Sequence, residues 1–199
     1  VLLAIYLAVG ALAIECKTSS NCENNQCDTV GGTEICMQCT AGNVPINGVC
    51  TAHTNSAEIS AAGCKESESI DVSGTSTKCG QCTSANYFLY KGGCYLAGSG
   101  TGGKLCTSAT DGVCKTPADG YFVPPGATKT DQSVISCSEG TEITVNSKKY
   151  KALLTAKCAQ LQSLIQKTLP SPLYVQPVRK DTSGPVVLHA TIKQTAPRA

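Results

Sequence analysis

Residues 36–50 read CMQCTAGNVPINGVC, and residues 79–95 read CGQCTSANYFLYKGGCY. Both stretches begin with Cys-x-Gln-Cys-Thr, continue with a short turn-rich or apolar segment, and close on glycine and a further cysteine. An altered third copy, CKTPADGYFVPPGATKTDQSVISC at residues 114–137, has Pro117 where the second cysteine of the pair is expected. A short cysteine phrase that recurs along a chain predicts small modules in series, each closed by its own disulfide bonds.

The composition agrees with a fold held by cross-links. The chain has 199 residues and 14 cysteines, but aromatic residues make up only 5% of it and tryptophan is absent. Large side chains supply most of the apolar area that drives folding, so this chain has little material for an ordinary core. Disulfide bonds compensate, at about 2–4 kcal/mol each, and they persist in oxidising compartments. We therefore expect a secreted or surface-exposed protein.

The cysteines could also hold zinc or act in redox catalysis, but the spacing favours structural disulfides. The two Cys-x-x-Cys pairs are separated by 39 residues, far beyond the spacing of a zinc knuckle, and His53 and His189 are isolated. A redox pair of the thioredoxin type begins a helix, which the residues after Cys82 do not suggest. We expect no enzyme activity and no cofactor, with zinc as the alternative. The predicted structural cysteines are Cys16, Cys22, Cys27, Cys36, Cys39, Cys50, Cys64, Cys79, Cys82, Cys94, Cys106, Cys114 and Cys137.

The expected fold is a row of EGF-like or furin-like cysteine-rich modules with short β-hairpins and little regular secondary structure. Residues 86–95 predict one hairpin, with its turn at Lys-Gly-Gly. We expect two-stranded pieces and no extended sheet. The pairing of the cysteines is not readable from the sequence, although Cys50 and Cys94 are candidate partners for the pairs before them. The cysteine-free stretches 51–63 and 65–78 are candidate display loops, or plain linkers.

The N-terminal residues predict a signal peptide. VLLAIYLAVGALA, residues 1–13, is apolar, uncharged and too short for a typical membrane span, and it ends in the small-x-small pattern that signal peptidase cleaves. We expect cleavage after Ala13 and an incomplete start, because the chain begins at Val1. The cysteine-rich region then occupies residues 14–150.

Residues 151–199 differ in charge and cysteine content. Residues 1–150 carry a net charge of −4 and 13 of the 14 cysteines, whereas residues 151–199 carry a net charge of +6 and one cysteine. One base inserted after the Lys151 codon would allow a reading with new cysteine pairs and a second copy of the 114–132 pattern. We interpret residues 152–199 as an out-of-frame translation, from a pseudogene, a natural truncation or a sequencing error. The alternative is a genuine basic tail with an amphipathic helix at about 150–169.

The repeated Cys-x-x-Cys phrases, the tetrapeptide Gly92-Gly93-Cys94-Tyr95 and the segment ADGYFVPPGATKTDQSVISCSEGTEITV at 118–145 resemble the variant-specific surface proteins of Giardia. The resemblance covers roughly residues 1–151. It implies a protein coat that evades antibodies by antigenic variation and resists intestinal proteases. It also implies a C-terminal membrane-spanning helix with a short cytoplasmic tail, for which this sequence has no candidate.

From these observations we expect a non-enzymatic surface antigen whose cysteines carry structure. Its expected partners are host antibodies and neighbouring coat proteins, with no nucleic acid and with a membrane only through an anchor absent from this chain. The expected location is the cell surface for an intact member, and secretion for the chain as given. The rival interpretation is a secreted EGF-like or furin-like adhesin or ligand-binding module.

Overall fold

The computed structural model describes residues 16–68, 70–138, 143–145 and 148–150. These residues all belong to the compact unit that spans residues 1–168. The predicted signal peptide with its cleavage after Ala13, the basic tail, its helix and its reading frame lie outside the described residues. Among the residues that are described, no helix is both long and apolar enough to cross a bilayer.

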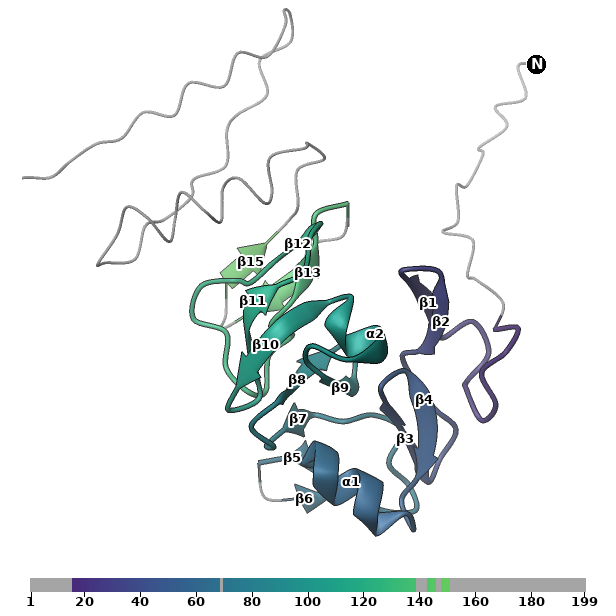
Figure 1. Ribbon diagram of the computed structural model, residues 1–199. Helices are drawn as coiled ribbons and strands as arrows, with labels where there is room; N and C mark the ends of the chain where they lie inside the picture. Colours follow the sequence, from purple (N-terminus) through teal and green to yellow (C-terminus); the bar gives the residue numbers. More distant parts are fainter. Residues whose placement is uncertain (1–15, 69, 139–142, 146–147, 151–199) are drawn as a thin grey trace, which may run out of the picture. The chain divides into compact units, whose positions relative to one another are not determined.

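Short β-strands dominate the described part of the chain, and the two helices in it are brief (Figure 1). Most strands pair with their sequence neighbour as a hairpin, which confirms the predicted disulfide-rich fold with little regular secondary structure. The elements are β1 Cys27–Val30, β2 Thr33–Cys36, β3 Asn43–Ile46, β4 Val49–Ala52, α1 Ser56–Ala62, β5 Cys64–Ser67, β6 Ile70–Asp71, β7 Gln81–Cys82, β8 Tyr87–Tyr90, β9 Gly93–Leu96, α2 Gly100–Gly103, β10 Cys106–Thr110, β11 Val113–Pro117, β12 Tyr121–Phe122, β13 Ile135–Ser136, β14 Ile143–Val145 and β15 Lys148–Tyr150.

The hairpins of the two intact cysteine phrases join into one sheet, so the expectation of two-stranded pieces alone is wrong. The strand order is β4-β3-β9-β8, with β3 and β9 parallel. The joint rests on one Cα pair, Ile46 with Cys94, and on Asn47. The Asn47 N–H donates to the Cys94 carbonyl at 2.8 Å, and its Oδ1 accepts from the Leu96 N–H at 2.8 Å. In an isolated hairpin, the backbone N–H and C=O groups on the outer edge of β3 or of β9 would lack partners. The joint between the two strands satisfies some of these groups.

Both hairpins of this sheet turn through two residues with positive φ, as a twisted hairpin with a two-residue turn requires. Asn47 and Gly48 have φ of 51° and 86°, and Lys91 and Gly92 have φ of 44° and 76°. Asparagine and glycine adopt this region at low cost, which explains the first turn directly. The second turn confirms the hairpin predicted from residues 86–95. Its first residue, Lys91, adopts a positive φ at a higher cost than asparagine or glycine would.

Helix α1 occupies the stretch that we expected to be a display loop or linker. Asn55 caps its first turn: Asn55 Oδ1 accepts from the Glu58 N–H at 3.5 Å, and Asn55 Nδ2 donates to the Glu58 carboxylate at 2.8 Å. Gly63 ends the helix in the left-handed conformation. Ile59 is buried on the inner face, so the outer face alone is available for display.

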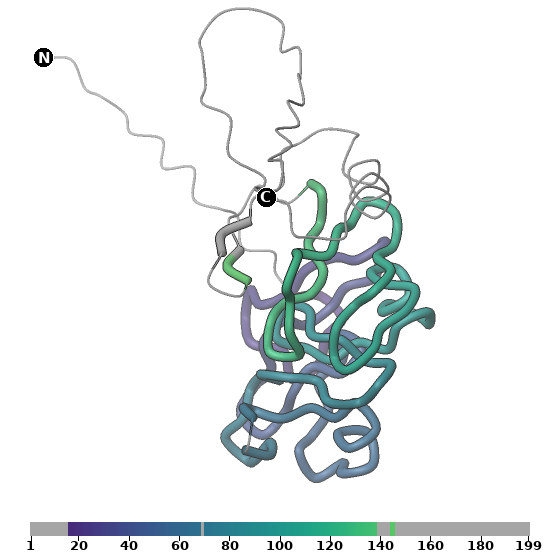
Figure 2. The backbone as a smooth tube through the Cα atoms, turned by 90° about the vertical axis from the view of Figure 1, so that its left-hand side faces the viewer, coloured from purple at the N-terminus to yellow at the C-terminus, as the bar shows by residue number. Residues whose placement is uncertain are grey.

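Strands β5 and β6, in the second expected loop, also form regular structure. They belong to a three-stranded sheet with the order β6-β5-β7. Beyond this sheet, the chain continues into the hairpin β10–β11, the two-residue strands of β12–β13 and the hairpin β14–β15. Figure 2 follows the same path in colour, from the purple N-terminal hairpin to the green residues before 138.

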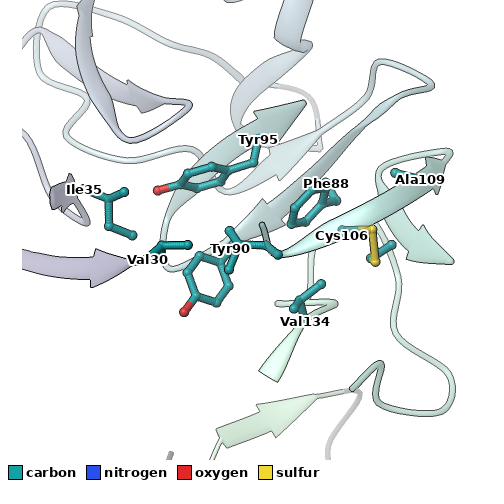
Figure 3. Packing of buried hydrophobic residues seen from close by; sticks show 10 residues of the cluster. Val30, Ile35, Phe88, Tyr90, Tyr95, Cys106, Ala109 and Val134 are labelled. Atoms are coloured by element: carbon teal, nitrogen blue, oxygen red, sulfur yellow. A yellow bond between two sulfur atoms is a disulfide. The ribbon is translucent and has the colours of Figure 1, made fainter. Parts of the chain in front are cut away.

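The interior contains two clusters of buried side chains. The first is built on aromatic residues: the rings of Phe88 and Tyr95 are 6.1 Å apart, and those of Tyr90 and Tyr95 are 5.8 Å apart and nearly perpendicular. Figure 3 shows these rings converging with Val30 and Ile35 from the β1–β2 hairpin. The second cluster has nine buried members, of which four are cysteines. Disulfide bonds therefore fill space that large apolar side chains fill in other proteins.

Candidate functional site: the disulfide framework

Six disulfide bonds connect the described cysteines before residue 115, and Cys137 is disulfide-bonded as well. No free cysteine occurs in the described part of the chain. The bonded Cα atoms lie between 5.4 and 6.0 Å apart, within the usual range for disulfides. The pairs are Cys16–Cys27, Cys22–Cys36, Cys39–Cys50, Cys64–Cys79, Cys82–Cys94 and Cys106–Cys114.

Two successive modules share one disulfide pattern. The two modules have four cysteine positions in common, of which the first bonds to the second and the third bonds to the fourth. Module one contains one additional cysteine, Cys27, which bonds to Cys16 outside the module. In module one these bonds are Cys22–Cys36 and Cys39–Cys50. In module two they are Cys64–Cys79 and Cys82–Cys94. The adjacent cysteines of each Cys-x-x-Cys phrase thus bond to different partners, and Cys50 and Cys94 each bond to the nearer member of the pair before them.

The backbone identifies a third module with the same framework and one substitution. The first and third positions face each other as antiparallel partners in all three modules: Cys22 with Cys39, Cys64 with Cys82, and Cys106 with Pro117. The first cysteines follow one another at intervals of 42 residues. Module three keeps the bond between its first two cysteines, Cys106–Cys114, and carries proline at the third position.

The loop after Pro117 takes a different path from the hairpins of modules one and two. Lys129 follows Pro117 by the same 12 residues that separate Cys82 from Cys94. Its backbone packs against Gly112, in the turn between β10 and β11, together with the Cys82 carbonyl oxygen. Gly112 has a φ of 77°, and its surroundings leave no room for a Cβ atom. Pro117 therefore removes the second disulfide from module three, and close packing around Gly112 occurs at this point of the chain.

Each residue of the tetrapeptide Gly92-Gly93-Cys94-Tyr95 has its own structural task. Gly92 supplies the positive φ of the turn, and Cys94 carries the disulfide and the parallel joint. A Cβ atom at Gly93 would lie 3.0 Å from Pro45 and from the Tyr95 ring, so a side chain where the two hairpins meet would require its neighbours to shift. Tyr95 fills the aromatic cluster. The tetrapeptide thus connects turn, cross-link, sheet and core.

An ion pair links module two to the N-terminal hairpin. Lys91 Nζ lies 2.8 Å from the Asp28 carboxylate, and both side chains are mostly shielded, with 19% and 28% exposed. The Tyr95 hydroxyl is buried, and it has no hydrogen-bond partner among the residues that the structure describes. Its burial raises the pKa of the Tyr95 phenol above the usual value, and the Asp28 carboxylate raises it further. The phenol therefore stays neutral beside the ion pair.

Glu34 fixes the chain immediately after Cys16. Its carboxylate accepts hydrogen bonds from the backbone N–H groups of Lys17, Thr18 and Ser19, at 2.8, 2.9 and 2.8 Å. The bonds from Lys17 and Thr18 contribute most, and together they lower the pKa of Glu34 from 4.5 to about 2. This carboxylate therefore holds residues 17–19, which lie within the loop that the first disulfide closes.

Sulfur atoms of neighbouring disulfides lie in contact. The Sγ atoms of Cys22 and Cys27 are 3.6 Å apart, and those of Cys36 and Cys39 are 3.9 Å apart. In module two, the Sγ atoms of Cys64, Cys79 and Cys94 lie within 4.8 Å of one another. Zinc binds thiolates, so a metal and these disulfides are alternatives for the same atoms. Sequence reasoning missed these contacts, because they depend on how the modules pack.

Comparison with known proteins places the chain among surface antigens of one parasite. It is 38% identical over 117 residues to variant-specific surface protein VSP4A1 of Giardia intestinalis, covering 57% of this chain and 17% of that protein. It is 39% identical over 137 residues to the major surface-labeled trophozoite antigen 417 of the same organism, covering 66% of this chain and 18% of that protein. The chain thus spans less than a fifth of either relative. No solved structure matches it.

The family model of the Giardia variant-specific surface proteins matches residues 6–168. This span contains the three modules and extends past Lys151, while the out-of-frame origin of residues 152–199 stays a prediction. The match confirms the family that the Cys-x-x-Cys phrases and the Gly-Gly-Cys-Tyr tetrapeptide indicated. The chain belongs to the variant-specific surface protein family of Giardia.

Proposed function

We propose that this chain supplies cross-linked, protease-resistant antigenic modules to a surface coat, and that it acts through structure and without catalysis or a cofactor. The observation that carries this proposal is the repeated disulfide framework, in which module one and module two have the same pairing. A parasite coat that varies between antigenic forms needs modules whose surface can change while the framework stays constant. Antibodies and neighbouring coat proteins are the partners of this role.

Protease resistance follows from the size of the closed loops. The six bonds join residues separated by 8 to 15 positions. A protease must bind several residues in an extended conformation, which short cross-linked loops resist, and a single cut inside such a loop leaves both ends attached. The four cysteines of module two are buried in the second cluster, so their disulfide bonds are also shielded from reductants in solution.

Digestion before and after reduction tests this part of the proposal. We expect trypsin and chymotrypsin to leave the oxidised chain intact for at least tenfold longer than the reduced and alkylated chain. The variant with Cys82→Ser and Cys94→Ser should be cut faster at Lys91 in module two than the oxidised native chain, while cleavage at Lys115, outside module two, should be unchanged as an internal control. Equal digestion rates for the oxidised and reduced chains would contradict the proposed resistance.

The antigenic surface of this proposal consists of the exposed residues between 53 and 76, which we term the display face. The outer residues of α1 and both residues of β6 are exposed there, including Ile70 at 56%. Ile59 and Ser76 are buried beneath them, so the backbone of this face has fixed support. Such a surface tolerates substitution while its framework holds, which antigenic variation requires.

Antibodies raised against the oxidised chain test the display face. We expect the variant with Ala57→Arg and Ser60→Arg, at two exposed positions of α1, to lose at least half of the polyclonal binding. Thr110→Arg, at an exposed position of β10, is the matched control and should retain it. Circular dichroism must be unchanged in both variants. If the α1 variant and the β10 variant bound the antibodies equally well, the display face would not be the antigenic surface. The proposed protease resistance would not be affected by that result.

A second candidate function, a secreted ligand-binding module, is favoured by a hollow of about 390 Å³ beside β4. Val49, 64% exposed, lies at this hollow together with Glu58 and Asn55. Its size suits a small amphipathic ligand. Screening the oxidised chain and Val49→Asp against a fragment library by NMR tests this function: shifts confined to the lining residues and lost in the variant would support it.

A further inference from the structure

Three disulfide bonds in residues 16–50 form a continuous series of sulfur atoms. The bond Cys16–Cys27 contacts the bond Cys22–Cys36 through the 3.6 Å approach of Cys27 to Cys22. That second bond contacts Cys39–Cys50 through the 3.9 Å approach of Cys36 to Cys39. Six sulfur atoms therefore follow one another as bond, contact, bond, contact, bond. We call this series the sulfur ladder.

We propose that the sulfur ladder is a thiol–disulfide exchange relay between Cys16 and Cys50. A low-molecular-weight thiol that attacks at one end would release a thiolate at the other. This activity goes beyond the structural role of the framework and does not depend on the antigenic function. Its substrates are small thiols and their disulfides.

The steps balance without an additional oxidant or reductant. The external thiolate forms a mixed disulfide with Cys16 and displaces the Cys27 thiolate. Cys27 attacks Cys22, forms the bond Cys22–Cys27 and displaces the Cys36 thiolate. Cys36 then attacks Cys39, forms the bond Cys36–Cys39 and displaces the Cys50 thiolate. One external thiolate is consumed and the Cys50 thiolate is released. The total number of disulfide bonds stays at three, of which two are then within the chain and one joins Cys16 to the small thiol.

The burial of the sulfur atoms matches these roles. Cys16 and Cys50, at the two ends, are half-buried and therefore reachable from solvent. Of the four interior cysteines, Cys27, Cys36 and Cys39 are buried and Cys22 is half-buried. The two thiolates that form inside the ladder after attack at Cys16 are the buried Cys27 and Cys36. An interior thiolate is consequently shielded from bulk reagent but lies beside the next disulfide, so that intramolecular attack has the advantage of proximity. Cys50 lines the hollow beside β4, where its released thiolate would meet a second reactant.

Module two provides an internal comparison. Its sulfur atoms Cys64, Cys79 and Cys94 also lie within 4.8 Å of one another, but all of its cysteines are buried. If the closeness of sulfur atoms were sufficient for exchange, module two would be as reactive as residues 16–50. The relay requires an accessible end as well, and this distinguishes residues 16–50 from module two.

Disulfide mapping after limited exchange tests the relay. The full oxidised chain is treated with glutathione until about one equivalent is incorporated, quenched with iodoacetamide, and digested without reduction for mass spectrometry. In the singly modified species we expect glutathione on Cys16, alkylation of Cys50, and the new bonds Cys22–Cys27 and Cys36–Cys39. Attack from the other end exchanges the two labels and gives the same new bonds. Singly modified species that retain Cys22–Cys36 would overturn the proposal.

Two variants separate transfer along the ladder from direct attack on each bond. With Cys39→Ser and Cys50→Ser, the relay ends one bond earlier, and alkylation should move from Cys50 to Cys36. With Cys64→Ser and Cys79→Ser, which removes a disulfide outside the ladder, the products from residues 16–50 should be unchanged. Alkylation that stays on Cys27 in the first variant would show that exchange stops at the first bond, which overturns the relay.

Discussion

Cys106 faces Pro117 across the β10–β11 ladder in the place where Cys64 faces Cys82 in the preceding module. Proline at this position removes the cysteine that would close the following hairpin. What remains there is β12–β13, with only two residue pairs. The two strands enclose a long connection, residues 123–134, where modules one and two have turns of two residues.

The shortened hairpin of module three should open most readily. A disulfide that closes a loop of this size contributes about 3 kcal/mol to stability, and β12–β13 lacks the bond that modules one and two have. We therefore expect amide hydrogen exchange at Tyr121 and Phe122 to be at least tenfold faster than at Val44 and Leu89. Hydrogen exchange with peptide-level mass spectrometry measures this on the oxidised chain. Equal protection would mean that close packing around Gly112 replaces the missing bond fully.

Gly112 and Gly120 form a matched pair for testing that packing. Both have a positive φ, 77° and 82°, so alanine costs about 1–2 kcal/mol of conformational strain at either position. At Gly112 the added Cβ atom would also meet the Cys82 carbonyl and Lys129, whereas at Gly120 it would meet nothing within 4 Å. Urea unfolding of the oxidised proteins should show Gly112→Ala to be less stable than Gly120→Ala by more than about 1 kcal/mol. Similar values would refute a steric role for this glycine.

The Tyr95 hydroxyl should contribute nothing to stability. It is buried without a hydrogen-bond partner in the described part of the chain, and such a group carries a desolvation cost of about 1–3 kcal/mol. Tyr95→Phe keeps the ring in the aromatic cluster and is expected to leave the free energy of unfolding unchanged or to raise it by about 1 kcal/mol. Tyr95→Ala, which empties the site, should cost about 3–5 kcal/mol. Destabilisation by the phenylalanine variant would indicate a partner for the hydroxyl.

Acid should release the segment 17–19 through Glu34. The pKa of this carboxyl is about 2 in the folded chain and 4.5 ordinarily, so its stabilising contribution is fully present above pH 4.5. The contribution declines as the pH falls and is lost below pH 2. An NMR titration of the Thr18 and Ser19 amides should show a midpoint near pH 2. In Glu34→Gln this transition should disappear, and a midpoint near 4.5 in the native protein would contradict the hydrogen-bond network.

The sequence allowed the local features of this fold to be predicted. The β8–β9 hairpin followed from its apolar strand and Lys-Gly-Gly turn, and the cysteine density indicated cross-links. Helix α1 was missed, although Asn55, Glu58 and Gly63 are the capping residues of a short helix. Its single strongly apolar inner residue, Ile59, gave too little periodicity to reveal it.

The joint between hairpins could not be predicted, for a physical reason. It uses one Cα pair and both the backbone N–H and the side chain of Asn47, and the positive φ of the turn already explains an asparagine at this position. The contacts of the sulfur ladder were equally hidden, because they depend on disulfide pairing and on packing between the N-terminal hairpin and module one. Pattern rules describe the neighbours of a residue along the chain, whereas these contacts join residues across modules.

The joint between β3 and β9 has a consequence for how such a chain can change over generations. Because so few residues form it, most surface positions of a module are under no constraint from its neighbour. A gene could exchange or duplicate whole modules by recombination, and the product would still assemble if it kept the four cysteines, the turn glycines, the asparagine at the joint and the buried side chains that neighbouring modules share. Inheritance would thus conserve a small set of framework residues while the surface between them diversified.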